Sequence, residues 1–543
     1  MEWLNLVSCL AAVLTIWPTS HVSAAVKLTH LSSVYLPYNV TSAGPQYNLS
    51  SDAVEQISYD AKEKIVYAGG YEVIHVIDVG NANKLELLYS KFVPGLDLTD
   101  VEVCGDYVFV SADNDINRLD GQLLVYKTHK KQGNTTMQLL KSVPVGPGPD
   151  NIYPRAGCKS VIVALEAEAF FDDAGKFVDP EGAVTIVSWP NGVEGTEQTL
   201  KKMDFKAFNS KVTELLPTGV RFVYRENNNT FSADVEPEYI ALDPEANKAY
   251  VCLQENNAVA VVDLSTETVT QIHGLGYKQW GVLDASDRDL GIQLSYWPIR
   301  AWYQPDAIQF VSWKGRKLVV SANEGDLKKY SNFREYLRGK QFTGLGDQIP
   351  DVMKTWLQED SQLGKLKMSK LDGKDEKGLY QALYTYGARS FSIWDAADGF
   401  RRIYDSGSDI EKHTAFQCPY AFNTEGDDID AKSDSKGPET ESLAVGQIGD
   451  RMFFFVGNEN PGTILVYSVG DDVTQPRFET IFCDGLPDNK KTLQEKFDAR
   501  EIFALDPEDI KFVTGPESPT GSPVLIVAGS VSGTVSVLKI EVS

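Results

Sequence analysis

Short apolar runs separated by turns occur along the whole chain. The segment from Pro237 to Leu264 is typical and reads PEYIALDPEANKAYVCLQENNAVAVVDL. An acid opens the segment, and three apolar stretches follow, separated by turns rich in Asp, Asn and Glu. Apolar runs of about four to eight residues between such turns indicate β-strands. The pattern therefore predicts a group of at least three strands joined by tight turns.

The same pattern recurs along the sequence. In each copy an acid precedes a first strand, a turn follows, and a second apolar strand ends near an acid or Asn. Seven copies begin at Glu55, Thr99, Pro149, Pro237, Pro305, Glu441 and Pro507. A unit of this size cannot bury both of its faces by itself, so the copies must pack against one another.

Strand-only units of this size and number pack radially in β-propellers. The repeat therefore predicts an all-β fold, a single seven-bladed β-propeller domain over residues 25–543. The last strand, near residues 535–542, is expected to close the ring beside early strands. Because the copies are unequally spaced, long insertions are expected on one face. An open pair of packed sheets is the structural alternative.

Two insertions stand out, over residues 327–385 and 405–437. The second is polar, acidic and turn-rich, and it predicts a long loop with a solvated surface of low affinity for cations. Its acids are Glu425, Asp427, Asp428, Asp430 and Asp434. The first insertion contains a run with the apolar spacing of an amphipathic helix. The apolar positions of this run are Ile349, Val352, Met353, Trp356 and Leu357.

The first 24 residues predict a signal peptide rather than part of the fold. The run Leu4–Trp17 is apolar but too short to span a bilayer, and PTSHVSAA follows it. Small residues at its end suit cleavage after Ala24. A buried N-terminal helix is the alternative. Since no later segment resembles a membrane span or a lipid-anchor signal, we expect a secreted protein without a membrane anchor.

Secretion agrees with the sequons and the cysteines. Sequons predict glycosylation at Asn39, Asn48, Asn134 and Asn228. Of six cysteines, Cys9 is lost with the signal. The five that remain are Cys104, Cys158, Cys252, Cys418 and Cys483. Because five is odd, at least one thiol is free or bonded to another chain. Cys252, inside the apolar run AYVCLQ, is expected to be buried.

The chain is strongly acidic, with a formal net charge of −25. Removing Glu2, the only charged residue of the signal, leaves a mature charge of −24. Such an excess argues against nucleic acid and anionic membranes as partners. It suits a protein that attracts cations, although solubility alone also favours acidity.

Two sets of acids recur at equivalent places in the copies. The first-strand acids open the copies, and they are Glu55, Asp150, Glu238, Asp306, Glu441 and Glu508. The second-strand acids follow the second strand, and they are Asp113, Glu166, Glu255, Glu324 and Glu459. Equivalent positions of a radial repeat fall on one ring, where carboxylates repel one another unless a positive charge lies among them.

That positive charge could come from Lys, from Arg or from a hard cation. Calcium binds six to eight oxygens of carboxylates, amides and carbonyls. We therefore predict a possible Ca2+ cofactor. The predicted metal ligands are Glu166, Glu255, Asn323, Glu324, Asp326 and Glu459. The alternative is that each acid caps a strand end or accepts bonds from turn N–H groups.

Other chemistry has little support in the sequence. The segment LDGKDEKG around Asp372 lacks the ligand spacing of a calcium loop, and no G-x-S-x-G or H-E-x-x-H motif is present. Only six His occur, and His21 is lost with the signal. Arg225, Arg316 and Arg389 lie near strand ends and could form a phosphate pocket, but each also suits a surface or salt-bridge role.

Several longer strings resemble the choice-of-anchor I family, from about Leu28 to Ile540. They include PDAIQFVSWKGRKLVVSANEGD, LYTYGARSFSIWDAADG and SDSKGPETESLAVGQIGDRMFFFVGNENPGTILVY. The residues that match the family strings are NEGD at 323–326, Arg389 and KGPE at 436–439. The resemblance implies a secreted or surface glycoprotein with a propeller-like fold, associated with calcium-carbonate biomineral such as shell or skeleton.

These observations lead to the functional hypotheses. The first is a secreted acidic glycoprotein of a mineralised extracellular matrix, whose partners are calcium or calcium-carbonate mineral and other matrix proteins. The alternative is a calcium-dependent phosphatase of the alkaline phosphatase or phytase type, since some bacterial relatives carry that label. A third is a propeller that docks another protein. The degraded Asp-rich loop at 372–378 and the missing anchor argue against a surface-anchored or strongly calcium-dependent protein and favour a soluble matrix component.

Overall fold

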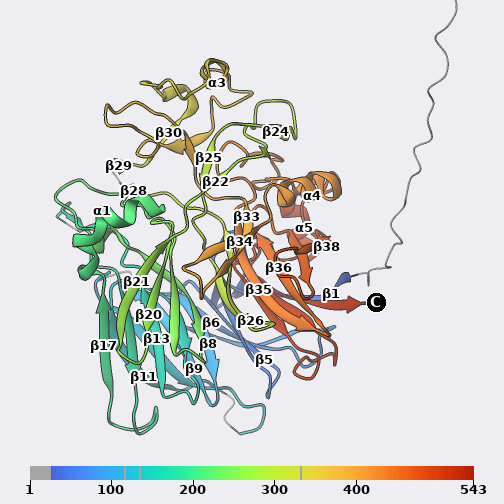
Figure 1. The fold of residues 1–543 in the computed structure, drawn as a ribbon. Coiled ribbons are helices and arrows are strands. Elements are labelled where there is room, and N and C mark those ends of the chain that lie inside the picture. The colour runs from blue at the N-terminus through green and yellow to red at the C-terminus, as the bar shows by residue number, and fades with distance from the viewer. Residues whose placement is uncertain (1–25, 115–117, 134–135, 173, 331–332) are drawn as a thin grey trace, which may run out of the picture.

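The computed structural model describes residues 26–114, 118–133, 136–172, 174–330 and 333–543. The predicted signal peptide and the sequon at Asn134 lie outside the described residues. Strands dominate the described chain, and helices are few and short (Figure 1). This confirms the all-β prediction.

Seven four-stranded antiparallel sheets contain the seven predicted copies, one copy in each sheet. The first three sheets are β4 (Gln56–Asp60), β5 (Ile65–Gly70), β6 (Val73–Asp78) and β7 (Glu86–Phe92); β8 (Leu96–Cys104), β9 (Tyr107–Asn114), β10 (Gly121–Lys127) and β11 (Leu139–Gly146); and β12 (Pro149–Pro154), β13 (Ser160–Leu165), β16 (Ala183–Ser188) and β17 (Thr199–Asp204). The fourth sheet is β18 (Pro237–Asp243), β19 (Lys248–Leu253), β20 (Ala258–Asp263) and β21 (Thr268–Gly274).

The remaining three sheets follow the same plan. They are β26 (Ile308–Trp313), β27 (Arg316–Asn323), β33 (Ser390–Asp395) and β34 (Arg401–Asp405); β35 (Thr440–Ile448), β36 (Arg451–Asn458), β37 (Ile464–Val469) and β38 (Arg477–Phe482); and β39 (Asp509–Val513), β40 (Val524–Gly529), β41 (Thr534–Val542) and β1 (Val26–Tyr35). In the last sheet β1 pairs with β41, with Val26 opposite Val542 and Leu28 opposite Ile540. The expected position of the final strand beside an early strand is therefore confirmed.

The first strands of the seven sheets contact one another in a circular order. Each touches the next along the chain, from β4 through β8, β12, β18, β26 and β35 to β39, and β39 touches β4. Side chains reinforce five of these contacts by accepting a hydrogen bond from a backbone N–H of the neighbouring first strand. The acceptors are Ser58, Asp100, Asn151, Gln309 and Asp509.

A separate apolar core lies between each pair of neighbouring sheets. In the first sheet Val66 and Ala68 face the core shared with the last sheet, whereas Ile65 and Tyr67 face the core shared with the second. Since both faces of a sheet are covered, its middle strands are apolar throughout, as in the fully buried β40. This explains the continuous apolar runs in the sequence.

The first insertion forms a cap over one end of the sheets (Figure 1). It contains the hairpins β28 (Lys329–Tyr330)–β29 (Phe333–Arg334) and β30 (Tyr336–Arg338)–β31 (Lys367–Ser369), with η3 (Gly339–Gln341) and β32 (Tyr384–Thr385). It packs on β22 (Tyr277–Gln279), β23 (Val282–Leu283), β24 (Ser295–Tyr296) and β25 (Arg300–Trp302) around a core of its own. Short strands and loops therefore make up most of an insertion that was expected to be helical.

The expected amphipathic helix of this insertion is present as α3 (Asp351–Trp356). Ile349, Met353 and Leu357 are buried in the cap core, and Trp356 packs against it. Val352, predicted on the same apolar face, is 50% exposed. That prediction was wrong because the helix has only six residues and turns Val352 outward.

The acidic insertion is more ordered than the loop expected from its composition. It contains α4 (Asp409–Gln417) and η4 (Pro419–Ala421). Asp430 and Asp434 are each only 5% exposed, and Asp434 forms ion pairs with Arg338 at 2.8 Å and Lys365 at 3.0 Å. The prediction of a solvated surface is therefore confirmed for Glu425, Asp427 and Asp428, which are exposed, and wrong for Asp430 and Asp434.

The remaining elements are short. They are β2 (Asn39–Thr41), β3 (Gly44–Gln46), β14 (Phe170–Phe171), β15 (Phe177–Val178), η1 (Lys206–Lys211), α1 (Val212–Leu215), η2 (Leu216–Thr218), α2 (Phe231–Asp234) and α5 (Leu493–Asp498). Within the described ranges, no helix has the length and apolar character needed to cross a membrane.

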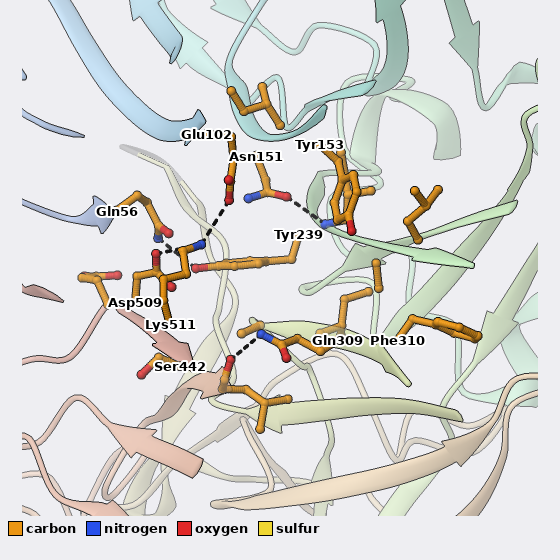
Figure 2. Close-up of a pocket in the computed structure, with 18 residues that line it drawn as sticks. Gln56, Glu102, Asn151, Tyr153, Tyr239, Gln309, Phe310, Ser442, Asp509 and Lys511 are labelled. Atoms are coloured by element: carbon orange, nitrogen blue, oxygen red, sulfur yellow. Dashed lines mark hydrogen bonds and ion pairs between the residues drawn. The ribbon is translucent and has the colours of Figure 1, made fainter. Parts of the chain in front are cut away.

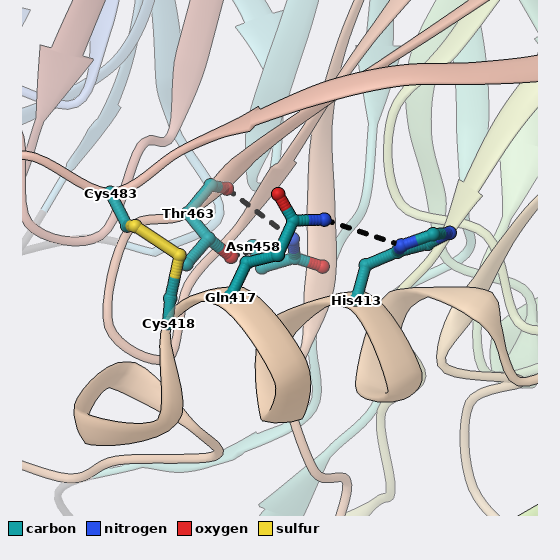
Figure 3. The surroundings of a disulfide bond; sticks show 6 residues. All are labelled: His413, Gln417, Cys418, Asn458, Thr463 and Cys483. Atoms are coloured by element: carbon teal, nitrogen blue, oxygen red, sulfur yellow. Dashed lines mark hydrogen bonds between the residues drawn. A yellow bond between two sulfur atoms is a disulfide. The ribbon is translucent and has the colours of Figure 1, made fainter.

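Two disulfides join parts of the chain that are distant in sequence. Cys104 at the end of β8 bonds Cys158 in the turn after β12, so this bond links neighbouring sheets. Cys418 at the end of α4 bonds Cys483 beyond β38, which ties the acidic insertion to the sixth sheet (Figure 3). Cys252 is free and buried. The expectation of an odd, buried thiol is confirmed.

Candidate functional site

Two of the second-strand acids, Glu324 and Glu459, lie where the family strings meet. NEGD begins at the last residue of β27, and KGPE directly precedes β35. A Cβ atom added to Gly325 would lie 2.1 Å from the backbone nitrogen of Gly387, and one added to Gly437 would lie 2.6 Å from Nε of Arg389. Glycine is therefore required for this close approach of NEGD, GARS and KGPE.

Lys436 lies among the acids of this region. Its Nζ contacts the Glu324 carboxylate, lies 2.7 Å from Glu439 and lies 3.8 Å from Asp326. Carboxylate oxygens of Glu324, Glu439 and Glu459 all lie within 4.8 Å of one another. Burial alone would raise the pKa of Glu439, but Lys436 and Lys432 outweigh it and hold that pKa down to about 2. A lysine thus supplies the positive charge that the acids need.

A second lysine acts in the same way on the other predicted ligands. Nζ of Lys328, which is buried, lies 2.7 Å from Glu236 and 3.8 Å from Asp234. Glu255 lies beside this pair: burial and Glu236 raise its pKa, and Lys328 opposes them. Burial likewise raises the pKa of Glu166, with further contributions from Asp150 and Glu255. Lys328 and Lys436 therefore form the centres of two groups that hold four of the second-strand acids, whereas Asp113 lies 3.9 Å from Arg118.

The predicted metal ligands meet only in part. Glu324 and Glu459 share one cluster, Asp326 lies at its edge, and Glu166 and Glu255 belong to the group around Lys328. Asn323 points elsewhere. Its amide donates to Ser390 and Ser392 and accepts from Ser321, so its bonds stay within its own sheet.

The first-strand acids have a different environment. Burial raises the pKa of all six, to about 8 for Glu55 and to about 7 for Asp150. Among the described residues, none of the six forms an ion pair with Lys or Arg. Carboxylates that are at least half-buried and have no ion pair are stabilised by holding protons or by sharing a cation.

Glu441 and Glu508 form the tightest group of first-strand acids, together with Asp506. Oxygens of the three carboxylates all lie within 4.8 Å of one another. The repeat pattern did not single out Asp506 or Glu236, and Glu439 was included only as part of KGPE. A signal was present: each of these acids stands two residues before a first-strand acid. Asp506 and Glu508 share one cluster, whereas Glu439 and Glu441 belong to different clusters, so this spacing marks acids of the site without fixing their partners.

A cavity of about 290 Å³ lies among the first strands of all seven sheets. Figure 2 shows Lys511 between Glu102 and Asp509, at 3.1 and 3.0 Å, and the Tyr239 hydroxyl beside Gln56, whose amide donates to it at 2.8 Å. Its polar side chains mostly bond one another or the neighbouring strand.

The remaining candidates from the sequence have structural partners. Asp372 accepts hydrogen bonds from Arg221 and Trp302, and Asp375 accepts from turn N–H groups. Arg389 bonds Glu411 at 2.7 Å and donates to the carbonyls of three residues. These residues are Asp284, Ser433 and Ser435.

Arg316 and Arg225 do not join Arg389. Arg316 pairs with Asp395 at 2.7 Å, and Arg225 donates to the carbonyl of Phe222. The three arginines thus serve different local contacts, and no phosphate pocket forms from them. The sequons at Asn39, Asn48 and Asn228 are exposed, as glycosylation requires.

The chain is similar to two animal proteins. It is 42% identical over 192 residues to Gigasin-3a of Magallana gigas, a match that covers 34% of this chain and 67% of that protein. It is 31% identical over 339 residues to the mesenchyme-specific cell surface glycoprotein of Strongylocentrotus purpuratus. That match covers 54% of this chain and 43% of the sea urchin protein, so the chain spans less than half of this relative.

Solved structures resemble the chain only distantly. The β-propeller domain of Myceliophteria thermophila Cps50 (Swd1) has a TM-score of 0.45 and 6% identity, and covers 94% of this chain and 99% of its own. Hydrazine synthase of Kuenenia stuttgartiensis has a TM-score of 0.44 and 11% identity, and covers 90% and 96%. Scores this low say nothing about function.

The family model of the choice-of-anchor I domain matches residues 55–472, which is most of the chain. The chain therefore belongs to the choice-of-anchor I family.

Proposed function

We propose that this protein is a secreted acidic glycoprotein of a mineralised extracellular matrix, shell or skeleton, and that it binds Ca2+ or calcium carbonate. The observation that carries the proposal is the excess of buried and half-buried carboxylates over lysines where the first strands meet. A relative that is named a cell surface glycoprotein supports an extracellular location. The two disulfides support it as well, because such bonds persist in oxidising compartments.

We further propose that the seven sheets are the blades of one seven-bladed β-propeller spanning residues 25–543. The circular order of first-strand contacts supports this arrangement, and so do the apolar cores between neighbouring sheets. In this arrangement β1 and β41 close the ring within one blade, so the N-terminal strand completes the sheet begun by the C-terminal strands.

The second-strand acids have a role in attracting cations. Glu166, Glu255, Glu324 and Glu459, together with the neighbouring Asp326, outnumber Lys328 and Lys436, and each of these carboxyls that ionises adds to the negative potential. A focused negative potential raises the local concentration of Ca2+ without requiring a dry coordination site. In this proposal exposed acids such as Asp427 and Asp428 contact mineral, and other matrix proteins are partners.

Adsorption of the purified secreted protein to calcium-carbonate powder tests the proposal. We expect saturable adsorption in 0.15 M NaCl that exceeds the adsorption of an unrelated soluble protein of similar net charge. Mass spectrometry of washed mineralised matrix should also detect the protein. Adsorption equal to that of the charge-matched protein would reject a specific role in mineral.

Hydrolysis of p-nitrophenyl phosphate, with and without Ca2+, tests the enzymatic alternative. We expect no turnover above the buffer rate, since the three candidate arginines do not converge. Calcium-dependent turnover that is lost in Glu324→Gln or Asp326→Asn would overturn the non-enzymatic proposal.

A further inference from the structure

Three carboxylates come together where the sixth and seventh sheets meet. Glu441 lies on β35, and Asp506 and Glu508 precede β39. The Glu441 carboxyl lies within hydrogen-bonding range of the carboxylates of both Asp506 and Glu508. We call Glu441, Asp506 and Glu508 the interblade cluster. Glu441 lies more than 60 residues before Asp506 and Glu508 in the sequence, yet one oxygen from each of the three carboxylates lies within 4.8 Å of the other two.

This spacing suits a shared calcium ion. Oxygen ligands lie about 2.3–2.6 Å from Ca2+, so two ligands of one ion can be at most about 5 Å apart. One oxygen from each carboxylate of the interblade cluster meets that limit with the other two. The cluster of Glu324, Glu439 and Glu459 meets it too, but there Lys436 already occupies the position of the cation.

Unsatisfied oxygens point independently to a missing partner. Glu441 Oε2 and Asp506 Oδ1 are closed to solvent and have no hydrogen-bond donor among the described residues. The same holds for Oε2 of Glu238, a first-strand acid that is 7% exposed. A buried acceptor without a partner costs about 1–3 kcal/mol. No Lys or Arg of the described chain pairs with the interblade cluster.

From this geometry we infer that the interblade cluster binds one divalent cation, Ca2+ in the extracellular setting, and that the ion fastens the sixth sheet to the seventh. Protein oxygens from Glu441, Asp506 and Glu508 supply part of the coordination shell, and water completes it. The inference rests on the proposed function only for the identity of the ion, because the geometry asks for a divalent cation whether or not mineral is bound.

Calcium content and calcium-dependent stability test the inference. The full secreted chain is stripped with EDTA, dialysed at pH 7.5 in 0.15 M NaCl and titrated with CaCl2 by calorimetry. We expect one site per chain that persists at this salt concentration, and a rise in melting temperature on adding 1 mM CaCl2. In Glu441→Gln/Asp506→Asn we expect affinity at least tenfold weaker and no rise in melting temperature.

Matched variants separate this site from its surroundings. Asp347→Asn removes an exposed carboxylate outside the interblade cluster and should keep the titrated site, and Glu324→Gln tests the lysine-neutralised cluster as the rival site. If the double variant is not secreted, Glu508→Gln replaces it, with the same expected loss of affinity. Wild-type protein that binds no Ca2+ at 1 mM would overturn the inference, since the cluster would then hold protons. Loss of the site in Glu324→Gln but not in the interblade variants would overturn it as well.

The outcome is independent of mineral binding. A chain that lacks the titrated site but still adsorbs to calcium carbonate would refute the inference and leave the proposed function standing. A chain that binds one ion but does not adsorb to calcium carbonate would support the inference and refute the proposed function.

Discussion

The carboxylate of Asp509 accepts a hydrogen bond of 3.0 Å from the backbone N–H of Ile57, although 452 residues separate the two. Asp509 begins β39 and Ile57 lies on β4, so this bond joins the first strands of the last and first sheets. Both residues are buried. The contact completes the circular order of first strands without any backbone pairing between these two sheets.

Replacing Asp509 is therefore expected to weaken the whole fold. Asp509→Ala leaves the N–H of Ile57 buried without a partner, which should lower the free energy of unfolding by about 1–3 kcal/mol. Asp509→Asn keeps an acceptor and should recover part of the loss. Denaturant unfolding of the secreted protein measures both, and Asp471→Ala at an exposed site should stay within about 0.5 kcal/mol of wild type. An Asp509→Ala protein as stable as wild type would show that this contact does not hold the ring.

Alkylation before and after unfolding should distinguish the free thiol of Cys252 from the four disulfide-bonded cysteines. Cys252 is buried and lies 2.7 Å from the carbonyl oxygen of Pro305, whereas the other four form disulfides. We expect no labelling of the native mature protein by iodoacetamide, and one labelled thiol per chain after unfolding without reductant. Peptide mapping should assign the label to Cys252. Labelling at Cys104 or Cys418 would contradict the disulfide pairing.

Removing the Cys104–Cys158 bond should destabilise the link between the second and third sheets. The bond closes a loop with a sequence separation of 54 residues, and disulfides of this kind contribute about 2–4 kcal/mol. We expect Cys104→Ser/Cys158→Ser to show a matching fall in the free energy of unfolding. Cys252→Ser, which breaks no covalent link, is the control and should lose less.

Arg389 and Glu411 form a buried ion pair, and removing either partner should destabilise the fold. Each side chain is 1% exposed, and the guanidinium also donates to three backbone carbonyls, one directly after β23 and two in the acidic insertion. Glu411→Gln leaves the buried Arg389 guanidinium without its counter-charge, and Arg389→Met leaves Glu411 and the three carbonyls without their donor. Each variant should lower the free energy of unfolding by about 3–5 kcal/mol. We expect reduced secretion and a lower melting temperature for each. Arg389→Lys should not restore stability, because a lysine cannot reach all these acceptors.

Stability without calcium should fall as the pH rises above 5. Burial and the neighbouring Asp430 raise the pKa of Asp284 to about 8, and burial raises that of Asp430 to about 7. The unfolded carboxyls titrate near 4. Between these values the folded state holds more protons than the unfolded state, so the free energy of unfolding decreases by up to about 1.4 kcal/mol per pH unit for each group.

Unfolding in EDTA from pH 5 to pH 8.5 measures this slope. Asp284→Asn cannot ionise and should have a shallower slope than wild type, whereas Asp347→Asn, at an exposed position, should match wild type. A slope that is unchanged in Asp284→Asn would mean that this carboxyl is already ionised in the folded protein.

The sequence alone was sufficient to predict the strands and their grouping. Each copy has its own apolar runs and turn residues, and these local patterns set which residues form strands whatever the neighbouring sheet is. The seven copies and the final strand beside an early one could therefore be read in advance. The burial of Cys252 could be predicted because the apolar run around it has the composition of a strand that is covered on both faces.

Only the tertiary structure decided what neutralises the acids. Glu324 and Lys436 are 112 residues apart, and their contact depends on how the fifth and sixth sheets pack, which no local pattern encodes. The same packing directs Asn323 into its own sheet, buries Asp430 and Asp434 and brings Asp506 to Glu441. Periodicity places a side chain on one face of a strand, but its partners across sheets are set by long-range packing. The repeat therefore located the acidic residues, and the fold determined which of them have a lysine beside them and which do not.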